Sequence, residues 1–186
     1  YIFEDNFSTP ASQHVTLETH VCVAKVDRAK NVTCWSSTQT PYIVRAQLAE
    51  TFRVSQSRVR VIVSTLGGGY GAKTYPKIEP LTAMLAWKAG LPVKLTLTRA
   101  EDFVSLTKHA ANIRMKTGIN KDGAIVAREV ESYWNAGAYA DISPRLIKNG
   151  GYASPGPYRI PNVKVDSYAV YTNLPPAGAF RGYGVA

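Results

Sequence analysis

Apolar and polar positions along this chain alternate in short strand-like segments, which are separated by stretches with helical spacing. Helical spacing is clearest at residues 42–52, where apolar side chains recur every three or four positions. A second helix is expected to begin near Pro76 and Pro80 and to end at Gly90, because proline suits a first helical turn and glycine a helix end. Shorter helices are expected at 100–106 and 142–149. The expected strands occupy 15–26, 31–36, 58–65, 93–98, 112–118, 124–134 and 163–171.

Turn residues separate these segments and help to define the fold class. Asp122-Gly123 lies between two strand-like runs and predicts a hairpin. Gly150 and Gly151 are expected to end the short helix before them. This mixture predicts an α+β fold, with mixed or antiparallel sheets and helices packed on one side. We expect one domain over 1–186, with two small subdomains at about 1–110 and 111–186 as a further possibility.

The composition is that of an ordinary globular protein. Hydrophobic residues make up 45% of the 186 residues and charged residues 19%, which excludes disordered, collagen-like and coiled-coil proteins. No apolar run reaches the roughly 18 residues that a membrane-spanning helix needs. The first residues are not those of a signal peptide, so we expect a cytoplasmic protein.

The chain is basic, with a formal net charge of +9. Its positive residues are scattered, and the densest group is only Arg53, Arg58 and Arg60. A basic face toward an anionic cofactor or an acidic partner subunit explains this charge as well as nucleic acid does. We therefore do not expect a nucleic-acid partner.

The most informative segment is the loop at 66–74, LGGGYGAKT, between a predicted strand and a predicted helix. Gly67, Gly69 and Ala72 fit the dinucleotide fingerprint G-x-G-x-x-A, but the helix does not follow at once and the expected acid after the next strand is missing. Lys73 and Thr74 are similar to the end of a phosphate-binding loop, whose obligatory glycine is replaced by Ala72. A tight turn alone explains one or two glycines. We favour a loop whose bare N–H groups approach a ligand closely.

The other reactive residues indicate no metal site and no nucleophile. The possible metal ligands contain no C-x-x-C or H-x-x-x-H pair and are interpreted as packed strand residues: His14, His20, Cys22, Cys34 and His109. The two cysteines are expected to be buried thiols. No G-x-S-x-G motif occurs. Glu18, Glu79 and Asp141 show no paired-carboxylate spacing, and an acid in the first turn of a helix explains Glu79.

A second notable segment is the irregular run at 171–184, which is rich in proline, glycine and aromatic residues. A surface loop rarely keeps so much aromatic material. We interpret it as a pocket wall, in which Phe180 and Tyr183 offer flat apolar surfaces and Arg181 a fixed donor to an anion.

Several segments, taken in order, resemble one protein family. They are GGGYGAK at 67–73, GLPVK at 90–94, TRAED at 98–102, NAGA at 135–138, YRIPN at 158–162 and AFRGYG at 179–184, together with 14–20 and SSTQTP at 36–41. The chain resembles the molybdenum hydroxylases, the family of xanthine dehydrogenase, aldehyde oxidase and carbon monoxide dehydrogenase. The resemblance covers nearly the whole chain and implies the first part of the molybdopterin-binding region. The start at Tyr1 favours an excised domain over one piece of a split subunit.

The resemblance implies roles for individual residues. Gln39 matches the glutamine whose amide points at an oxo ligand of molybdenum. The loop that brings backbone N–H groups to the cofactor corresponds to Gly68, Gly69, Tyr70 and Gly71, with Tyr70 facing substrate. The loop under the metal corresponds to Ala179, Phe180 and Arg181, and the aromatic pair around a flat substrate to Phe180 and Tyr183. No direct metal ligand is implied here. The family's catalytic glutamate lies outside the matched region, so we expect no catalytic residue in this chain and no activity from it alone.

The resemblance also implies cofactors, partners and a reaction. The complete enzyme would hold molybdenum on molybdopterin in a dinucleotide form, with iron–sulfur clusters and FAD on partner subunits or domains. The expected partners are the remaining half of the molybdenum subunit, an iron–sulfur subunit and a flavin subunit. The family hydroxylates an electron-poor carbon with water as the oxygen source. Because Thr74 and Asn149 replace a Glu and an Arg of purine-oxidising members, we expect an aldehyde or another aromatic heterocycle as substrate.

Two alternatives stay open at this stage. One is a nucleotide-binding oxidoreductase that uses the loop from Gly67 to Ala72. The other is a basic binding module without enzymatic activity, whose binding to nucleic acid would fall steeply with salt. Neither explains Gln39 or the AFRGYG segment.

Overall fold

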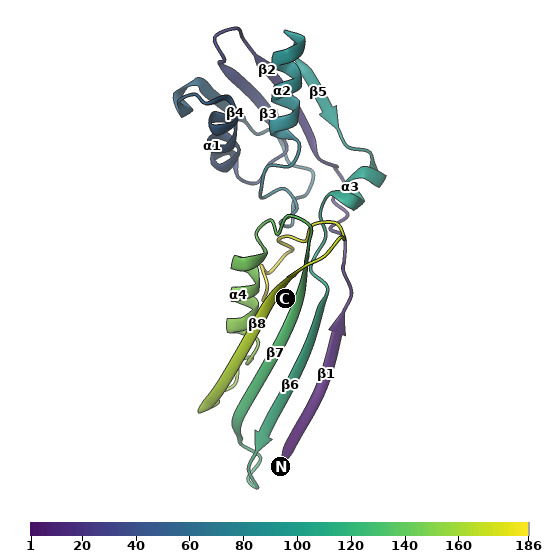
Figure 1. Ribbon diagram of the computed structural model, residues 1–186, viewed down its shortest axis with the longest axis vertical. Coiled ribbons are helices and arrows are strands. Elements are labelled where there is room, and N and C mark those ends of the chain that lie inside the picture. The colour runs from purple at the N-terminus through teal and green to yellow at the C-terminus, as the bar shows by residue number, and fades with distance from the viewer. Residues whose placement is uncertain (186) are drawn as a thin grey trace. The chain divides into compact units, whose positions relative to one another are not determined.

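The computed structural model describes residues 1–185, which form two compact units (Figure 1). One unit is His14–Ser105, and the other combines Tyr1–Gln13 with the chain from Leu106 onward. The expected change of subdomain was at about residue 110, with the N-terminus in the first subdomain. The structural division differs because the N-terminal strand pairs with a strand of the second unit.

The His14–Ser105 unit contains one four-stranded mixed sheet. Its strands are β2 (Val21–Val26), β3 (Val32–Ser36), β4 (Val59–Ile62) and β5 (Val93–Thr96). Its helical elements are α1 (Pro41–Phe52), a short 3-10 helix at Gln56–Arg58, α2 (Glu79–Ala89) and α3 (Arg99–Ser105). The strand order is β4-β3-β2-β5, with β3 and β4 parallel and the other neighbours antiparallel.

The core of this unit lies between the sheet and helices α1 and α2 (Figure 1). Its fully buried members include Cys22, Cys34, Val44, Leu48 and Ala83. The Sγ atoms of Cys22 and Cys34 lie 3.4 Å apart as free thiols. The hydrogen-bond contact with Cys22, followed by burial, raises the pKa of the Cys34 thiol far above its usual range, which keeps it uncharged. The expectation of two buried thiols is confirmed.

The second unit is also built on a four-stranded mixed sheet. Its elements are β1 (Ile2–Thr9), β6 (Ala111–Ile119), β7 (Ile125–Gly137), α4 (Ser143–Ala153) and β8 (Asn162–Tyr171). The strand order is β1-β6-β7-β8, antiparallel except for the parallel pair β7 and β8. Helix α4 packs against β8 and β7 (Figure 1). A small core forms there from Leu146, Ile147 and Ala179, with Trp134 and Tyr183 packed against it.

The predicted α+β class, with mixed sheets and helices, is confirmed, and most of the expected elements are present. Helix α1 begins at Pro41, and Gly90 ends α2 in a left-handed conformation with φ +66°. The predicted hairpin joins β6 and β7. Within residues 1–185, no helix is both long enough and apolar enough to cross a membrane.

Three expectations about elements were wrong. The strand expected at 15–26 begins only at Val21, because Val15 has a φ of 49° and the backbone of Glu18 bonds to Gly67 instead of a neighbouring strand. The strand β1 was not anticipated, and all of its residues are exposed. Helix α4 continues through Gly150 and Gly151.

Close packing explains the two glycines in α4. A Cβ atom on Gly150 would lie 2.9 Å from a ring carbon of Trp134, and one on Gly151 would lie 2.8 Å from Ser167 Oγ. Both residues are buried. Their role is therefore to let the helix approach the sheet, not to end the helix.

Candidate functional site

The loop at 66–74 follows β4 and forms tight turns before α2 begins at Glu79. Gly68, Tyr70 and Gly71 have positive φ angles of 97°, 51° and 106°. Two internal bonds stabilise the turns, from Ala72 N to Gly69 O at 2.8 Å and from Thr74 N to Gly71 O at 3.2 Å. The loop does not open a helix directly, as a dinucleotide-binding fingerprint requires.

Gln39 lies against this loop. Gly71 N donates a hydrogen bond to Gln39 Oε1 at 2.9 Å, and Gln39 N donates to Lys73 O at 2.8 Å. A Cβ atom on Gly69 would lie only 2.5 Å from Gln39 Oε1, so glycine at this position lets the Gln39 side chain lie against the loop. The structure thus brings together Gln39 and the glycine loop, which the sequence analysis selected separately.

The loop and Gln39 together form a set of hydrogen-bond donors. Because Gln39 Oε1 accepts from Gly71, its NH₂ group is the end of the amide left to donate. Within residues 1–185, neither this NH₂ group nor the N–H groups of Gly68 and Gly69 has a hydrogen-bond acceptor. Tyr70 is 47% exposed beside them. A donor-rich, glycine-lined surface suits a ligand with several oxygen acceptors, so these residues fit an oxygen-rich cofactor.

Lys73 points away from this surface and into the protein. It is 1% exposed, and its Nζ atom lies 2.8 Å from both the backbone oxygen and Oε2 of Glu18. Glu18 also holds the start of the loop, since Gly67 N donates to Glu18 Oε2 at 3.1 Å and Glu18 N to Gly67 O at 3.0 Å. The Lys73 amine is therefore not placed to bind a phosphate. This ion pair, in which Lys73 is buried and the Glu18 side chain is 31% exposed, was not expected from the sequence.

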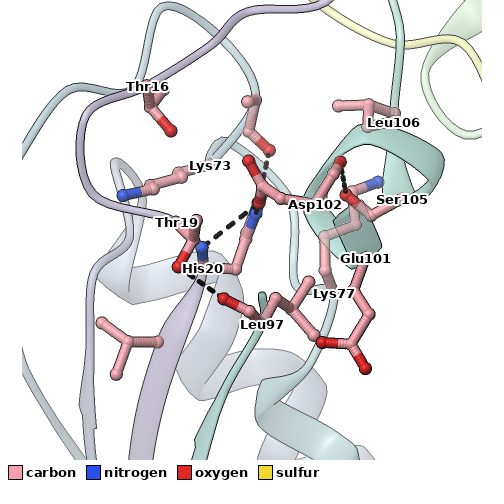
Figure 2. Close-up of polar contacts among 12 residues, drawn as sticks. Thr16, Thr19, His20, Lys73, Lys77, Leu97, Glu101, Asp102, Ser105 and Leu106 are labelled. Atoms are coloured by element: carbon pink, nitrogen blue, oxygen red, sulfur yellow. Dashed lines mark hydrogen bonds and ion pairs between the residues drawn. The ribbon is translucent and has the colours of Figure 1, made fainter. Parts of the chain in front are cut away.

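A buried histidine–aspartate pair holds the far end of the loop. His20 Nδ1 lies 2.6 Å from Asp102 Oδ1, and His20 Nε2 lies 3.2 Å from the carbonyl oxygen of Ala72. Figure 2 shows His20, next to β2, and Asp102, on α3, directed at each other. Both are 4% exposed, and Arg99 NH1 lies 3.5 Å from Asp102 Oδ2.

These contacts show that His20 is a hydrogen-bonded residue, as expected. No group of three or more His, Cys, Asp or Glu side chains that could hold a metal ion occurs in the part of the chain that the structure describes. Glu79 is more than a helix-end charge, because it is 4% exposed and accepts hydrogen bonds from Ser36 Oγ at 2.6 Å and Lys77 N at 2.9 Å.

The AFRGYG segment belongs to the other unit. Ala179 is buried, Phe180 is partly buried with Lys108 Nζ at 5.9 Å from its ring centre, and Arg181 is exposed. Tyr183 packs against the core beside α4, with a positive φ of 51°. The predicted joint role of this segment with the glycine loop stays a prediction.

A buried histidine, His109, is linked through Ser143 to the backbone of Ala177, just before the AFRGYG segment. His109 Nε2 lies 2.7 Å from Ser143 Oγ, which donates to Ala177 O at 3.1 Å. His109 is 1% exposed, and its Nδ1 atom has no partner among the described residues. Burial lowers the pKa of His109 to about 4, although Asp141 acts in the opposite direction. His109 is therefore neutral at pH 7.

A comparison with known proteins identifies relatives of the whole chain. A model of the molybdopterin cofactor-binding domain matches residues 1–186. The nicotinate dehydrogenase large molybdopterin subunit of Eubacterium barkeri is 38% identical over 185 residues, which are 99% of this chain and 44% of that subunit. The xanthine dehydrogenase molybdenum-binding subunit of Escherichia coli is 36% identical over 186 residues, which are 99% of this chain and 25% of that protein. The chain thus spans less than half the length of these relatives.

A solved structure has the same fold. The aldehyde oxidoreductase of Desulfovibrio gigas superposes with a TM-score of 0.92 over 99% of this chain and 20% of its own. Sequence identity is 24%, so this likeness concerns the fold.

Proposed function

The chain belongs to the molybdopterin cofactor-binding domain family, and on that premise we propose that it forms one part of a larger molybdenum hydroxylase. The observation that carries the proposal is the placement of Gln39, whose Oε1 atom is held by Gly71 N–H so that its NH₂ group is left to donate. This is the orientation that a glutamine facing an oxygen ligand requires. A nucleotide-binding oxidoreductase receives no such support, because the glycine loop lacks the helix that its phosphate site needs.

We assign binding roles to residues of both units. Gln39 and the N–H groups of Gly68 and Gly69 donate hydrogen bonds to the cofactor, and Gly71 orients the Gln39 amide. Tyr70 lies beside these donors as an exposed aromatic wall for substrate. In the other unit, the loop of Ala179, Phe180 and Arg181 serves the cofactor, with Phe180 and Tyr183 as walls around a flat substrate. When bound, the molybdenum cofactor supplies a redox-active metal that activates water.

The substrate we propose is an aromatic heterocycle or an aldehyde, with water as the oxygen source. The named relatives support a heterocycle, since they are subunits of a nicotinate dehydrogenase and of a xanthine dehydrogenase. Thr74 and Asn149 provide no carboxylate or guanidinium at the two positions where purine-oxidising members carry them. A purine is therefore the weaker candidate.

The complete enzyme would need further parts. We propose that the catalytic base lies in the remaining half of the molybdenum subunit, that the pterin is a dinucleotide, and that iron–sulfur and flavin subunits or domains remove the electrons. This chain alone would then be inactive. A cytoplasmic location agrees with a reducing environment for the free thiols Cys22 and Cys34.

The test is oxidation by the complete protein, purified with its partners and supplied with nicotinate, an aromatic aldehyde or xanthine in ¹⁸O-labelled water. We expect the label in the product. Gln39→Ala should lower kcat at least tenfold, because it removes one donor at the reacting centre. Gln47→Ala, on the exposed side of α1, is the matched control and should leave kcat unchanged. Label from dioxygen, or equal effects of the two variants, would refute the proposal.

A further inference from the structure

Four titratable side chains bond to the glycine loop, directly or through one another, and take no part in its donor surface. Lys73 pairs with Glu18, and His20 pairs with Asp102. Lys73, His20 and Asp102 are each at most 4% exposed. A buried ion pair loses so much hydration that apolar residues of similar size often stabilise a protein equally well or better. Lys73 loses this hydration completely, although the side chain of its partner Glu18 stays 31% exposed, so stability alone does not account for a buried amine under this loop.

The Lys73–Glu18 pair closes the loop on itself. Lys73 Nζ binds Glu18 at 2.8 Å, and Glu18 binds Gly67 through both its backbone and its carboxylate. The first and last parts of the loop are thus fixed to one residue. The backbone oxygen of Lys73 also accepts from Gln39 N at 2.8 Å and from Thr38 Oγ1 at 3.2 Å. A displacement of Lys73 would consequently move Gln39 as well.

The His20–Asp102 pair fixes the peptide next to Lys73. His20 Nδ1 lies 2.6 Å from Asp102 Oδ1, and His20 Nε2 lies 3.2 Å from the Ala72 carbonyl oxygen, which can only accept a hydrogen bond, so Nε2 donates to it. The ring therefore connects the Ala72 carbonyl to Asp102 on α3. Asp102 also accepts from His20 N at 3.3 Å, which orients the ring (Figure 2).

We propose that the pairs Lys73–Glu18 and His20–Asp102 are positioning residues, which hold the glycine loop and Gln39 in their ligand-binding arrangement before the cofactor is bound. The proposal rests on the proposed function, because it takes the loop as the cofactor-binding surface. A loop that is already ordered spares the cofactor the entropy of ordering it. The two pairs thereby favour cofactor retention without touching the cofactor.

The experiment measures hydrogen exchange by mass spectrometry in the complete protein, made with and without the molybdenum cofactor. Lys73→Met keeps the length of the side chain and removes its amine. We expect exchange in peptides covering 66–74 to rise about tenfold in the cofactor-free protein, the effect of losing one hydrogen bond of this kind. The cofactor should suppress most of that rise. Molybdenum content after gel filtration should fall in the variant.

Two further variants separate positioning from general destabilisation. Leu48→Ala removes fully buried core volume in α1 and should raise exchange in α1 but not in 66–74. His20→Gln keeps one donor for the Ala72 carbonyl but loses the ring contact with Asp102, so its loop exchange should rise less than in His20→Leu, which should behave like Lys73→Met. If Lys73→Met does not fold, the double variant with Glu18→Gln removes the uncompensated carboxylate and takes its place.

The outcomes distinguish the two proposals. If the wild type holds molybdenum and loop exchange in Lys73→Met and His20→Leu equals that of the wild type, the positioning role is overturned and the proposed function stands. Equal loop exchange in Leu48→Ala and Lys73→Met overturns the positioning role in the same way. If the wild-type protein holds no molybdenum, both proposals are overturned.

Discussion

In a Gly69→Ala variant, the added methyl carbon would lie 2.5 Å from Oε1 and 2.6 Å from Cδ of Gln39. The Gln39 side chain has to move, because real Cβ contacts are not this short, and it then loses the hydrogen bond from Gly71 N–H. That bond contributes about 1 kcal/mol. A strained rotamer adds up to about 1 kcal/mol. We expect the free energy of unfolding to fall by about 1–2 kcal/mol.

The matched control is Gly90→Ala at the end of α2. Gly90 has a φ of +66° and no atom within 4 Å of its missing Cβ, so alanine there costs about 1 kcal/mol of backbone strain and touches nothing. Denaturant unfolding should show a similar decrease in the free energy of unfolding for both variants. Amide exchange at Gly71 should rise roughly tenfold in Gly69→Ala only. Unchanged protection of the Gly71 amide in Gly69→Ala would refute the contact with Gln39.

Two further predictions concern the unit that contains α4. The pKa of His109 is lowered to about 4, so as pH falls from 6.5 toward 4 the unfolded state binds the proton first, and about 3 kcal/mol of stability is lost. The free energy of unfolding, measured between pH 7 and pH 4, should fall by this amount in the wild type and depend less on pH in His109→Gln. Identical pH dependence in the two proteins would contradict the role of His109. Gly137→Ala should cost more than 2 kcal/mol, because its Cβ would meet Pro175 O at 2.1 Å at a φ of +69°. Gly123 has a similar φ but open space around an added Cβ, so Gly123→Ala should lower the free energy of unfolding by only about 1 kcal/mol. Equal changes in melting temperature for the two variants would refute the packing argument.

Local chemistry made much of the fold predictable. Pro41 and Gly90 mark helix ends through backbone geometry that needs no distant partner. The segment at 14–20 was different, because Glu18 bonds to Gly67, which is 49 residues away. A partner so distant leaves no trace in the local alternation of apolar residues. Gly150 and Gly151 were misread for a related reason, since the neighbour that requires them lies on the sheet.

In the candidate site, too, features set by local sequence could be predicted and contacts between distant residues could not. Gln39 and the glycine loop could be selected from motifs, and the structure places them in contact. The pairs Lys73–Glu18 and His20–Asp102 join residues 55 and 82 positions apart. Nothing in the sequence around Lys73 distinguishes an amine that binds phosphate from one that is buried against a carboxylate. The roles of Ala179, Phe180, Arg181 and Tyr183 rest on resemblance and remain predictions.

The most direct test of the central claim is the molybdenum and pterin content of the complete protein that carries this chain, purified with its partners. We expect molybdenum and pterin in the wild type, loss of both in Gln39→Ala combined with Gly69→Ala, and no loss in Gln47→Ala. Absence of molybdenum, together with tight binding of a nicotinamide or adenine nucleotide, would contradict it and assign the glycine loop to a nucleotide.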